Sequence, residues 1–163
     1  IQGRSRRRQM ELADRFGIAG YSQPAGGCAL TDENYGRRFK EMIERDGAPA
    51  LTRRTALLLA VGRHFRLAGG AKAVVGRNRT ENLHIARSFP EEWLAEPVDC
   101  PGPTTLVLGA ASREDLKTAA ALTARYSDCK REGNVRIRIS RGEEELLLEV
   151  EPVSEEDLER YRV

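Results

Sequence analysis

The residues from 76 to 82 combine basic and amide side chains in a way that suits the binding of anions. The segment reads GRNRTEN, and Asn78 is followed three residues later by Glu81. This spacing resembles a capping box with asparagine in place of the usual serine or threonine, so a helix is expected to begin here. The start of a helix carries partial positive charge, and Arg77 and Arg79 flank it. The pattern predicts an anion site, although hairpin and capping chemistry alone explain the same residues equally well.

A β-hairpin is expected immediately before this segment. Gly69-Gly70 supplies a turn in which positive φ is free. Counting back from the glycine pair places Phe65 opposite Val74 and His64 opposite Val75. The second strand then leads directly into the helix start, so polar side chains of the hairpin can contribute to the same site.

Two kinds of polar side chain extend the candidate site. From the hairpin, His64 and Arg66 are expected on the polar side, with Lys72 nearby. From the helix, Asn78 and Asn82 are four residues apart and therefore share a face. Such donors suit backbone phosphates, sugars or exposed bases. The alternative for His64 is a position that simply faces water, and for Asn82 it is an inward hydrogen bond that fixes the helix on the sheet.

Composition limits what this site can recognise. Aromatic residues are 6% of the chain, which favours recognition of shape and phosphate over base-by-base reading of a single strand. The net charge of +2 does not by itself indicate a nucleic-acid-binding protein. Arginines gather at the start of the chain and around residues 76–82, whereas acidic residues concentrate after residue 142. A basic face for phosphates is plausible on this distribution, and a solvated surface is the alternative. The candidate binding residues are His64, Arg66, Lys72, Arg77, Asn78, Arg79, Glu81 and Asn82.

Cys28 is the residue whose position suggests covalent chemistry. It lies in PAGGCALTD, a glycine-backed turn just ahead of a predicted helix. A cysteine near a helix N-terminus has a lowered pKa and can act as a nucleophile or a sulfur carrier. A small buried residue in a tight turn is the alternative, and no histidine lies nearby in the sequence.

No metal or nucleotide site is predicted. His64 and His84 have no cysteine or glutamate at ligand spacing, and Cys28, Cys100 and Cys129 match no zinc pattern. The economical interpretation of the three cysteines is reduced thiols in a cytoplasmic protein. AGGAK lacks the Lys-Ser/Thr end of a P-loop, no GxGxxG follows a strand, and no Ser-Gly-Gly-x-Asp-Ser loop is present. This chain is therefore expected to hold no cofactor and no ATP site.

The chain has the composition of a soluble protein. Its 163 residues are 40% apolar and 32% charged, and no run of about 18 apolar residues is present, so no membrane span is expected. No signal-peptide pattern is visible. The sequence begins at Ile1 without methionine, so we expect it to be a trimmed piece of a longer protein.

The elements form an alternating pattern. Helices are expected at 5–16, from Thr31 to Asp46-Gly47, and from Thr52 to Gly62. After them come the hairpin, the helix from Asn78, strands at 93–98 and 105–108, a helix at 112–126, strands at 135–139 and 145–150, and an acidic tail. From Leu51 the order is ββαββαββ, which predicts an α+β domain with a mostly antiparallel sheet. The predicted division is a helical extension, 1–48, and a domain, 49–163.

Two motifs in combination resemble known families. The segment GRHFRLAGGAKAVVGRNRTEN is similar to the RNA-binding module of the NFACT family, whose hairpin ends in Gly-(Lys/Arg)-Asn-x-x-(Glu/Gln)-Asn. The upstream segment GYSQPAGGCALTDENYGRRFKEMI resembles a group of bacterial proteins in which a PP-loop ATPase domain precedes an NFACT-like domain. That ATPase domain is similar to the tRNA 4-thiouridine and 2-thiouridine synthetases. The resemblance covers roughly residues 3–128.

The resemblance implies binding of tRNA or another structured RNA, coupled to sulfur transfer in the intact parent. It implies ATP in an upstream domain, contact with that domain and a possible sulfur-donor protein. The PP-loop itself is absent, so this chain alone is not expected to be catalytic. Cys28 matches the position where the parent could hold a catalytic or cluster-ligating thiol. Two alternatives stand beside RNA binding: a sulfur carrier that uses Cys28, and a domain that only docks on its own ATPase domain.

Overall fold

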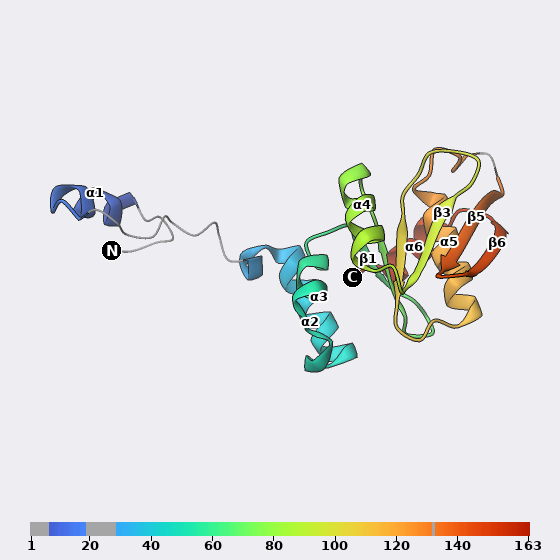
Figure 1. The fold of residues 1–163 in the computed structure, drawn as a ribbon, viewed down its shortest axis with the longest axis horizontal. Helices are drawn as coiled ribbons and strands as arrows, with labels where there is room; N and C mark the ends of the chain where they lie inside the picture. Colours follow the sequence, from blue (N-terminus) through green and yellow to red (C-terminus); the bar gives the residue numbers. More distant parts are fainter. Residues whose placement is uncertain (1–6, 19–28, 132) are drawn as a thin grey trace. The chain divides into compact units, whose positions relative to one another are not determined.

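The structure, a computed structural model, describes residues 7–18, 29–131 and 133–163 (Figure 1). By compactness the chain divides into two units, residues 1–36 and 37–163. The functional boundary expected between residues 48 and 49 stays a prediction. Cys28 lies outside the described residues, and so does most of the turn that contains it.

The first unit is helical where it is described. It contains α1 (Arg7–Arg15) and the 3₁₀ turn η1 (Ala29–Thr31), and α2 (Glu33–Asp46) begins in it. Asp32, and not Thr31, caps α2, because the Asp32 carboxylate accepts a hydrogen bond from the Tyr35 backbone N–H at 2.8 Å. The helix ends at Asp46 as expected, and Gly47 follows with a φ of 80°.

The second unit is built on a six-stranded antiparallel sheet with the strand order β1-β2-β4-β3-β5-β6. The strands are β1 (Arg63–Arg66), β2 (Lys72–Val75), β3 (Trp93–Pro97), β4 (Thr105–Leu108), β5 (Val135–Arg141) and β6 (Glu144–Val150). The helices between the hairpins are α4 (Arg79–Ser88) and α5 (Arg113–Arg125). This arrangement confirms the predicted ββαββαββ order and the α+β class.

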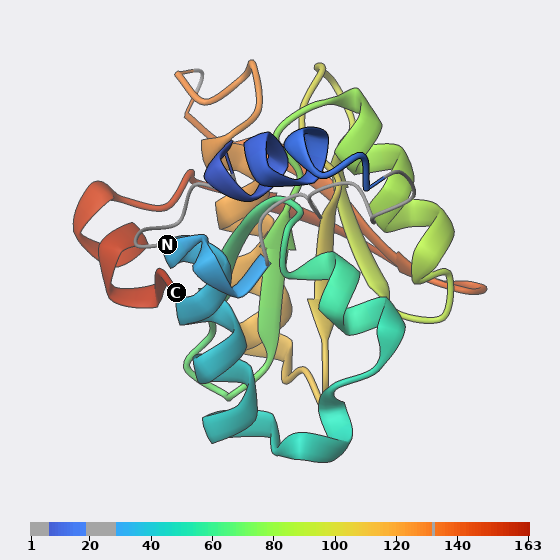
Figure 2. The same ribbon diagram turned by 90° about the vertical axis from the view of Figure 1, so that its left-hand side faces the viewer.

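Helices cover both faces of the sheet in this unit, with α4 on one side and α5 on the other (Figures 1 and 2). On the α5 side, Ala119 and Ala120 are buried in the larger core. Their short side chains let the helix approach the strands closely. On the α4 side, Ile85 packs in a smaller core with Val74 and Leu106. Alternate residues of β2 thus face the two cores, as expected because successive side chains of a strand point to opposite faces of the sheet.

Two shorter helices complete the second unit. The connection from α2 runs through η2 (Ala48–Ala50) to α3 (Arg53–Leu58), which is capped by Thr52 as predicted but ends before Gly62. Arg38 covers the last carbonyls of this turn, donating to the Leu59 oxygen at 2.8 Å and the Gly62 oxygen at 3.1 Å. The acidic tail is a helix, α6 (Glu155–Tyr161), anchored by the buried Leu158. This helix contains only two apolar residues, Leu158 and Tyr161, so the sequence shows no helical periodicity from which to predict it.

The register predicted for the β1–β2 hairpin is wrong by one residue. Phe65 pairs with Ala73 and His64 with Val74. The reason is an odd-numbered loop: Leu67 N–H donates to the Ala71 carbonyl at 2.9 Å, which leaves three residues in the turn. Gly70, the last of them, has a φ of 97°, the left-handed conformation that a three-residue hairpin loop requires.

The expectation of three reduced thiols is also wrong, because Cys100 and Cys129 form a disulfide. The bridge joins the connection between β3 and β4 to the segment that follows α5. Asp128 N–H donates to the Pro101 carbonyl at 3.0 Å and ties the same two segments together. Spacing along the sequence could not reveal this pairing, since tertiary folding alone brings the two cysteines together.

Candidate nucleic-acid interface

The start of α4 has the cap that the sequence predicts, with one change. Asn78 Oδ1 accepts a hydrogen bond from the Glu81 backbone N–H at 3.0 Å. Glu81 does not reach back to Asn78. Its Oε2 accepts from the Arg77 N–H at 2.8 Å and from the Gly62 N–H at 3.2 Å. The glutamate therefore ties the turn before α4 to the residue that precedes β1, and it fixes the helix start on the hairpin.

Gly76 and Asn82 fit together at the same turn. A Cβ atom at position 76 would lie 2.0 Å from Asn82 Oδ1, so no larger residue can occupy that position without moving the amide. Asn82 Nδ2 lies 3.4 Å from the Gly102 carbonyl, in the connection before β4. This bond ties the start of α4 to the connection before β4, and a role of Asn82 in RNA binding stays a prediction. The spacing Gly-x-Asn-x-x-Glu-Asn thus has a structural basis at each named residue.

Replacing Gly76 by alanine is expected to lower the free energy of unfolding by about 1–3 kcal/mol, because the new methyl group displaces Asn82. Urea denaturation of the variant and of wild type measures the difference. Gly36→Ala in α2 is the matched control, since its Cβ would meet only ordinary contact at 3.6 Å. The penalty should shrink in an Asn82→Ala background. An equal penalty in both backgrounds would contradict the clash.

A groove of about 460 Å³ opens beside the start of α4. Its floor and walls come from the strand β1, the turn before α4, the connection before β4 and the end of α5. The lining residues are Arg63, Gly76, Arg77, Asn78, Arg79, Asn82, Pro101, Gly102, Pro103 and Tyr126. Four of the eight predicted binding residues, Arg77, Asn78, Arg79 and Asn82, are among them.

The groove keeps positive charge. Arg77 is compensated, because its guanidinium pairs with Glu81 at 2.6 Å. That hydrogen bond raises the pKa of Arg77; burial pushes the pKa of Glu81 up, but the bonds from Arg77 outweigh burial and hold it below its ordinary value. Within the described part of the chain, neither Arg63 nor Arg79 forms an ion pair. Two arginines therefore leave the groove a net cationic surface.

One wall of the groove contains an aromatic platform, which is the Tyr126 ring with Arg63 stacked on it. The Arg63 guanidinium lies over the ring of Tyr126, 4.5 Å from its centroid, and the ring centroid of Phe65 is 6.3 Å from that of Tyr126. Planar arginine groups stacked on aromatic rings accept unpaired bases on their other face. Neither Arg63 nor Tyr126 was among the predicted residues. No local pattern marks them, since they come together only when β1 packs beside the end of α5.

Most of the chain matches the model of a known protein family. The model of the NFACT protein RNA binding domain matches residues 62–162, which is more than half of the chain. The chain belongs to this family. The matched NFACT segment includes every strand of the sheet and all the residues that line the groove.

A solved structure confirms the fold assigned to this NFACT domain. The C-terminal part of the fibronectin/fibrinogen-binding protein from Streptococcus suis superposes with a TM-score of 0.54 at 17% sequence identity. The similarity covers 83% of this chain and 64% of that chain, so this chain spans less than two thirds of the structure it resembles. None of the curated proteins compared with this chain matches it.

Three predicted binding residues of the NFACT hairpin lie outside the groove. His64 is 1% exposed, so the prediction that it faces the polar side is wrong. Its Nε2 lies 2.8 Å from the Val61 carbonyl. Burial, reinforced by the charges of Lys72 and Arg38, lowers the pKa of His64 to about 3, so the ring is neutral. It shares a face with Arg66, as predicted, but the helical layer of α2 and α3 covers that face.

Arg66 and Lys72 are held in ion pairs under the same layer. Glu41 of α2 contacts Arg66 Nε at 2.5 Å and Lys72 Nζ at 2.6 Å, and Asp46 contacts Arg66 at 2.7 Å. Lys72 is 4% exposed. A role of these two side chains in RNA binding stays a prediction, and the geometry shows them joining α2 to the hairpin.

The part of the chain that the structure describes has neither a cluster of metal ligands nor a membrane-spanning helix. No three metal-ligating side chains come together there. No helix there is both long and apolar enough to cross a bilayer.

Proposed function

We propose that this chain binds structured RNA in the groove beside α4, with tRNA as the first candidate ligand. The observation that carries the proposal is the pair of uncompensated arginines in the groove, Arg63 of β1 and Arg79 at the start of α4, in a domain of an RNA-binding family. Phosphates carry the charge that such a surface attracts. The backbone N–H groups at a helix start add donors that suit the same oxygens.

The arrangement favours a particular division of contacts. We infer that Arg79 and the start of α4 contact phosphate and that the Arg63–Tyr126 stack receives one unpaired base. Tyr126 is the aromatic residue of the groove lining. One stacking position reads little sequence, so we infer that recognition depends on phosphate positions and on the shape of a bend or loop.

The identity of the RNA and the wider reaction are finer proposals. The choice of tRNA rests on the resemblance of two sequence motifs, PAGGCALTD and the hairpin that leads into α4, to proteins with a PP-loop domain. On this proposal the chain presents tRNA to an ATP-dependent sulfur-transfer domain of the same parent protein. On this proposal the groove holds the RNA, and the sulfur-transfer chemistry belongs to the other domain of the parent protein.

Filter binding of total tRNA across a salt series tests the proposal. The observed affinity should fall as salt rises, since each phosphate contact releases counterions. Arg79→Gln is expected to weaken binding about three- to tenfold at low salt and to reduce the slope of log K against log [salt] by about 0.7–1. Arg77→Gln should have a smaller effect, because Glu81 already neutralises Arg77.

Arg113→Gln is the matched control. It removes the same charge at the opposite end of α5 from Tyr126, about 20 Å away at 1.5 Å per residue. Tyr126→Leu, which removes the platform but no charge, should weaken binding and leave the salt slope unchanged. Equal losses for Arg79→Gln and Arg113→Gln, or binding without salt dependence, would overturn the proposal.

A further inference from the structure

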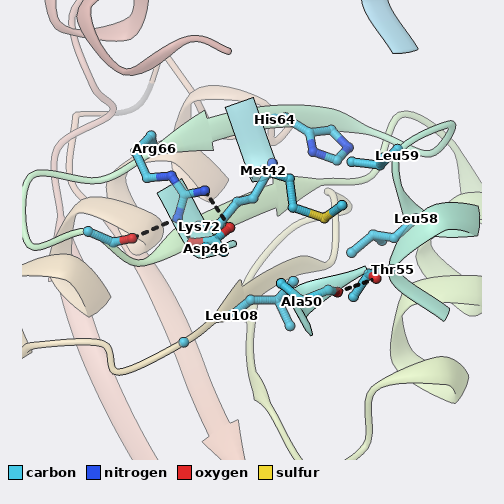
Figure 3. Close-up of a pocket in the computed structure, with 12 residues that line it drawn as sticks. Met42, Asp46, Ala50, Thr55, Leu58, Leu59, His64, Arg66, Lys72 and Leu108 are labelled. Carbon is cyan, nitrogen blue, oxygen red and sulfur yellow. Dashed lines mark hydrogen bonds and ion pairs between the residues drawn. The ribbon is translucent and has the colours of Figure 1, made fainter. Parts of the chain in front are cut away.

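A second cavity, of about 280 Å³, is lined by residues of the sheet and of the α2–η2–α3 layer (Figure 3). The strands contribute His64, Lys72 and Leu108 to its lining, and the helical layer contributes Met42 and Leu58. An apolar cavity of about 150 Å³ holds benzene. This cavity therefore has room for a larger, two-ring molecule.

The cavity has an open and a closed end. Asp46, Gly70 and Gly109 are exposed and form the opening. At the other end Leu58 and His64 are 2% and 1% exposed. Figure 3 shows the His64 ring beside Met42 and Leu59, so the imidazole lies among apolar side chains at the closed end. A ligand that entered from the opening would meet His64 last.

His64 has an unused acceptor. Its Nε2 lies 2.8 Å from the Val61 carbonyl, and its Nδ1 has no hydrogen-bond partner in the described part of the chain. The Leu58 carbonyl also acts on the ring, but a carbonyl has no proton to donate. A neutral imidazole that donates through Nε2 keeps a lone pair on Nδ1. Leaving such a buried acceptor unpaired is costly, so the site favours a ligand that donates a hydrogen bond.

The charges around the cavity select against an ionic ligand. Arg66 and Lys72 are cations, and Asp46 and Glu41 are anions that pair with them. These four charges cancel and are paired with one another. Arg38, whose charge also acts on His64, donates to the Leu59 and Gly62 carbonyls. An added charge would have no counterion there and would lose its hydration.

We propose that this cavity binds a small neutral aromatic molecule with one hydrogen-bond donor, of the class of indoles and phenols, whose donor meets His64 Nδ1. The apolar ring occupies the space between Met42, Leu58 and Leu108. This binding site is separate from the RNA groove and does not depend on it.

Methyl resonances of methionine test the proposal directly, because the chain has only two methionines, Met10 and Met42. The full chain labelled with ¹³C at the methionine methyl groups is titrated with indole. Saturable movement of the Met42 signal, with the Met10 signal of α1 unmoved, is expected. An unmoved Met42 signal up to the solubility limit of indole, as for a cavity that holds only water, would overturn the proposal.

Two comparisons test whether indole donates a hydrogen bond to His64 and whether it binds in this cavity. N-Methylindole cannot donate, so it should bind roughly three- to tenfold more weakly than indole, and this difference should vanish in His64→Leu. Ala50→Phe fills the cavity and should abolish the indole response, whereas Leu57→Phe, at an exposed position of α3, should not. Equal affinity of the two probes for wild type, or an unchanged response in Ala50→Phe, would contradict the site.

Discussion

Replacing Glu41 by glutamine is expected to lower the free energy of unfolding by about 3–5 kcal/mol, measured by urea denaturation at pH 7. Glu41 contacts Arg66 at 2.5 Å and Lys72 at 2.6 Å, and the Lys72 side chain is 5% exposed. Glutamine keeps the shape but removes the negative charge, so the Lys72 ammonium stays buried without its counterion. Burial already lowers the pKa of Lys72 although Glu41 opposes it. The carboxylate is therefore required to hold the lysine in place.

Glu44→Gln is the matched control on the same helix. Glu44 pairs with Lys40 at 3.8 Å, and its side chain is 62% exposed. An exposed pair contributes about 0–1 kcal/mol, so this variant should unfold almost as wild type does. Equal losses from the two variants would show that the buried network does not hold α2 on the hairpin.

The contribution of Glu41 should also depend on pH. Burial pushes its pKa up, but the hydrogen bonds from Arg66 and Lys72 outweigh burial, and the pKa in the folded chain lies below 4.5, its ordinary value. A lowered carboxyl pKa stabilises the fold above the unfolded value, and this stability is lost as the pH falls through the folded value. Wild type should therefore lose stability towards acid below about pH 4.5 more steeply than Glu41→Gln. Parallel pH profiles would contradict the assignment.

Breaking the Cys100–Cys129 disulfide is expected to cost about 2–4 kcal/mol of stability. The bridge joins the connection that carries the groove residues Pro101 and Gly102 to the segment that follows Tyr126. Without it the unfolded chain gains freedom and two walls of the groove lose a covalent tie. Urea denaturation of Cys129→Ser at pH 7 measures the loss, and tRNA affinity of the same variant should fall as well.

Cys28→Ser is the control for the loss of a thiol, because Cys28 is not part of the bridge. Added dithiothreitol should destabilise wild type and Cys28→Ser alike, and it should leave Cys129→Ser unchanged. Insensitivity of wild type to the reductant, with both cysteines titrating as free thiols, would show that the bridge does not form.

The sequence by itself determined the elements whose signals are local. Helices begin at the predicted positions, with Thr52, Asn78 and Ser112 as their caps. A cap is a local signal, because its side-chain oxygen accepts from an N–H only three residues later. Alternation in Val135–Arg141 and the alanines of α5 likewise report a buried face directly. The order of these elements was enough to predict an antiparallel α+β sheet.

Tertiary structure decided which polar residues are available. His64 and Arg66 alternate as a solvent-facing strand would, yet a helical layer covers that face and turns them into a buried ring and an ion-pair network. Arg63 and Tyr126 enter the groove, and Cys100 meets Cys129, through contacts between distant segments. Whether a side chain is buried or paired depends on which element packs over it, and the local spacing of residues does not indicate that element. The Asn78 cap could be predicted from the sequence because its partner, the Glu81 N–H, lies within one turn of the helix.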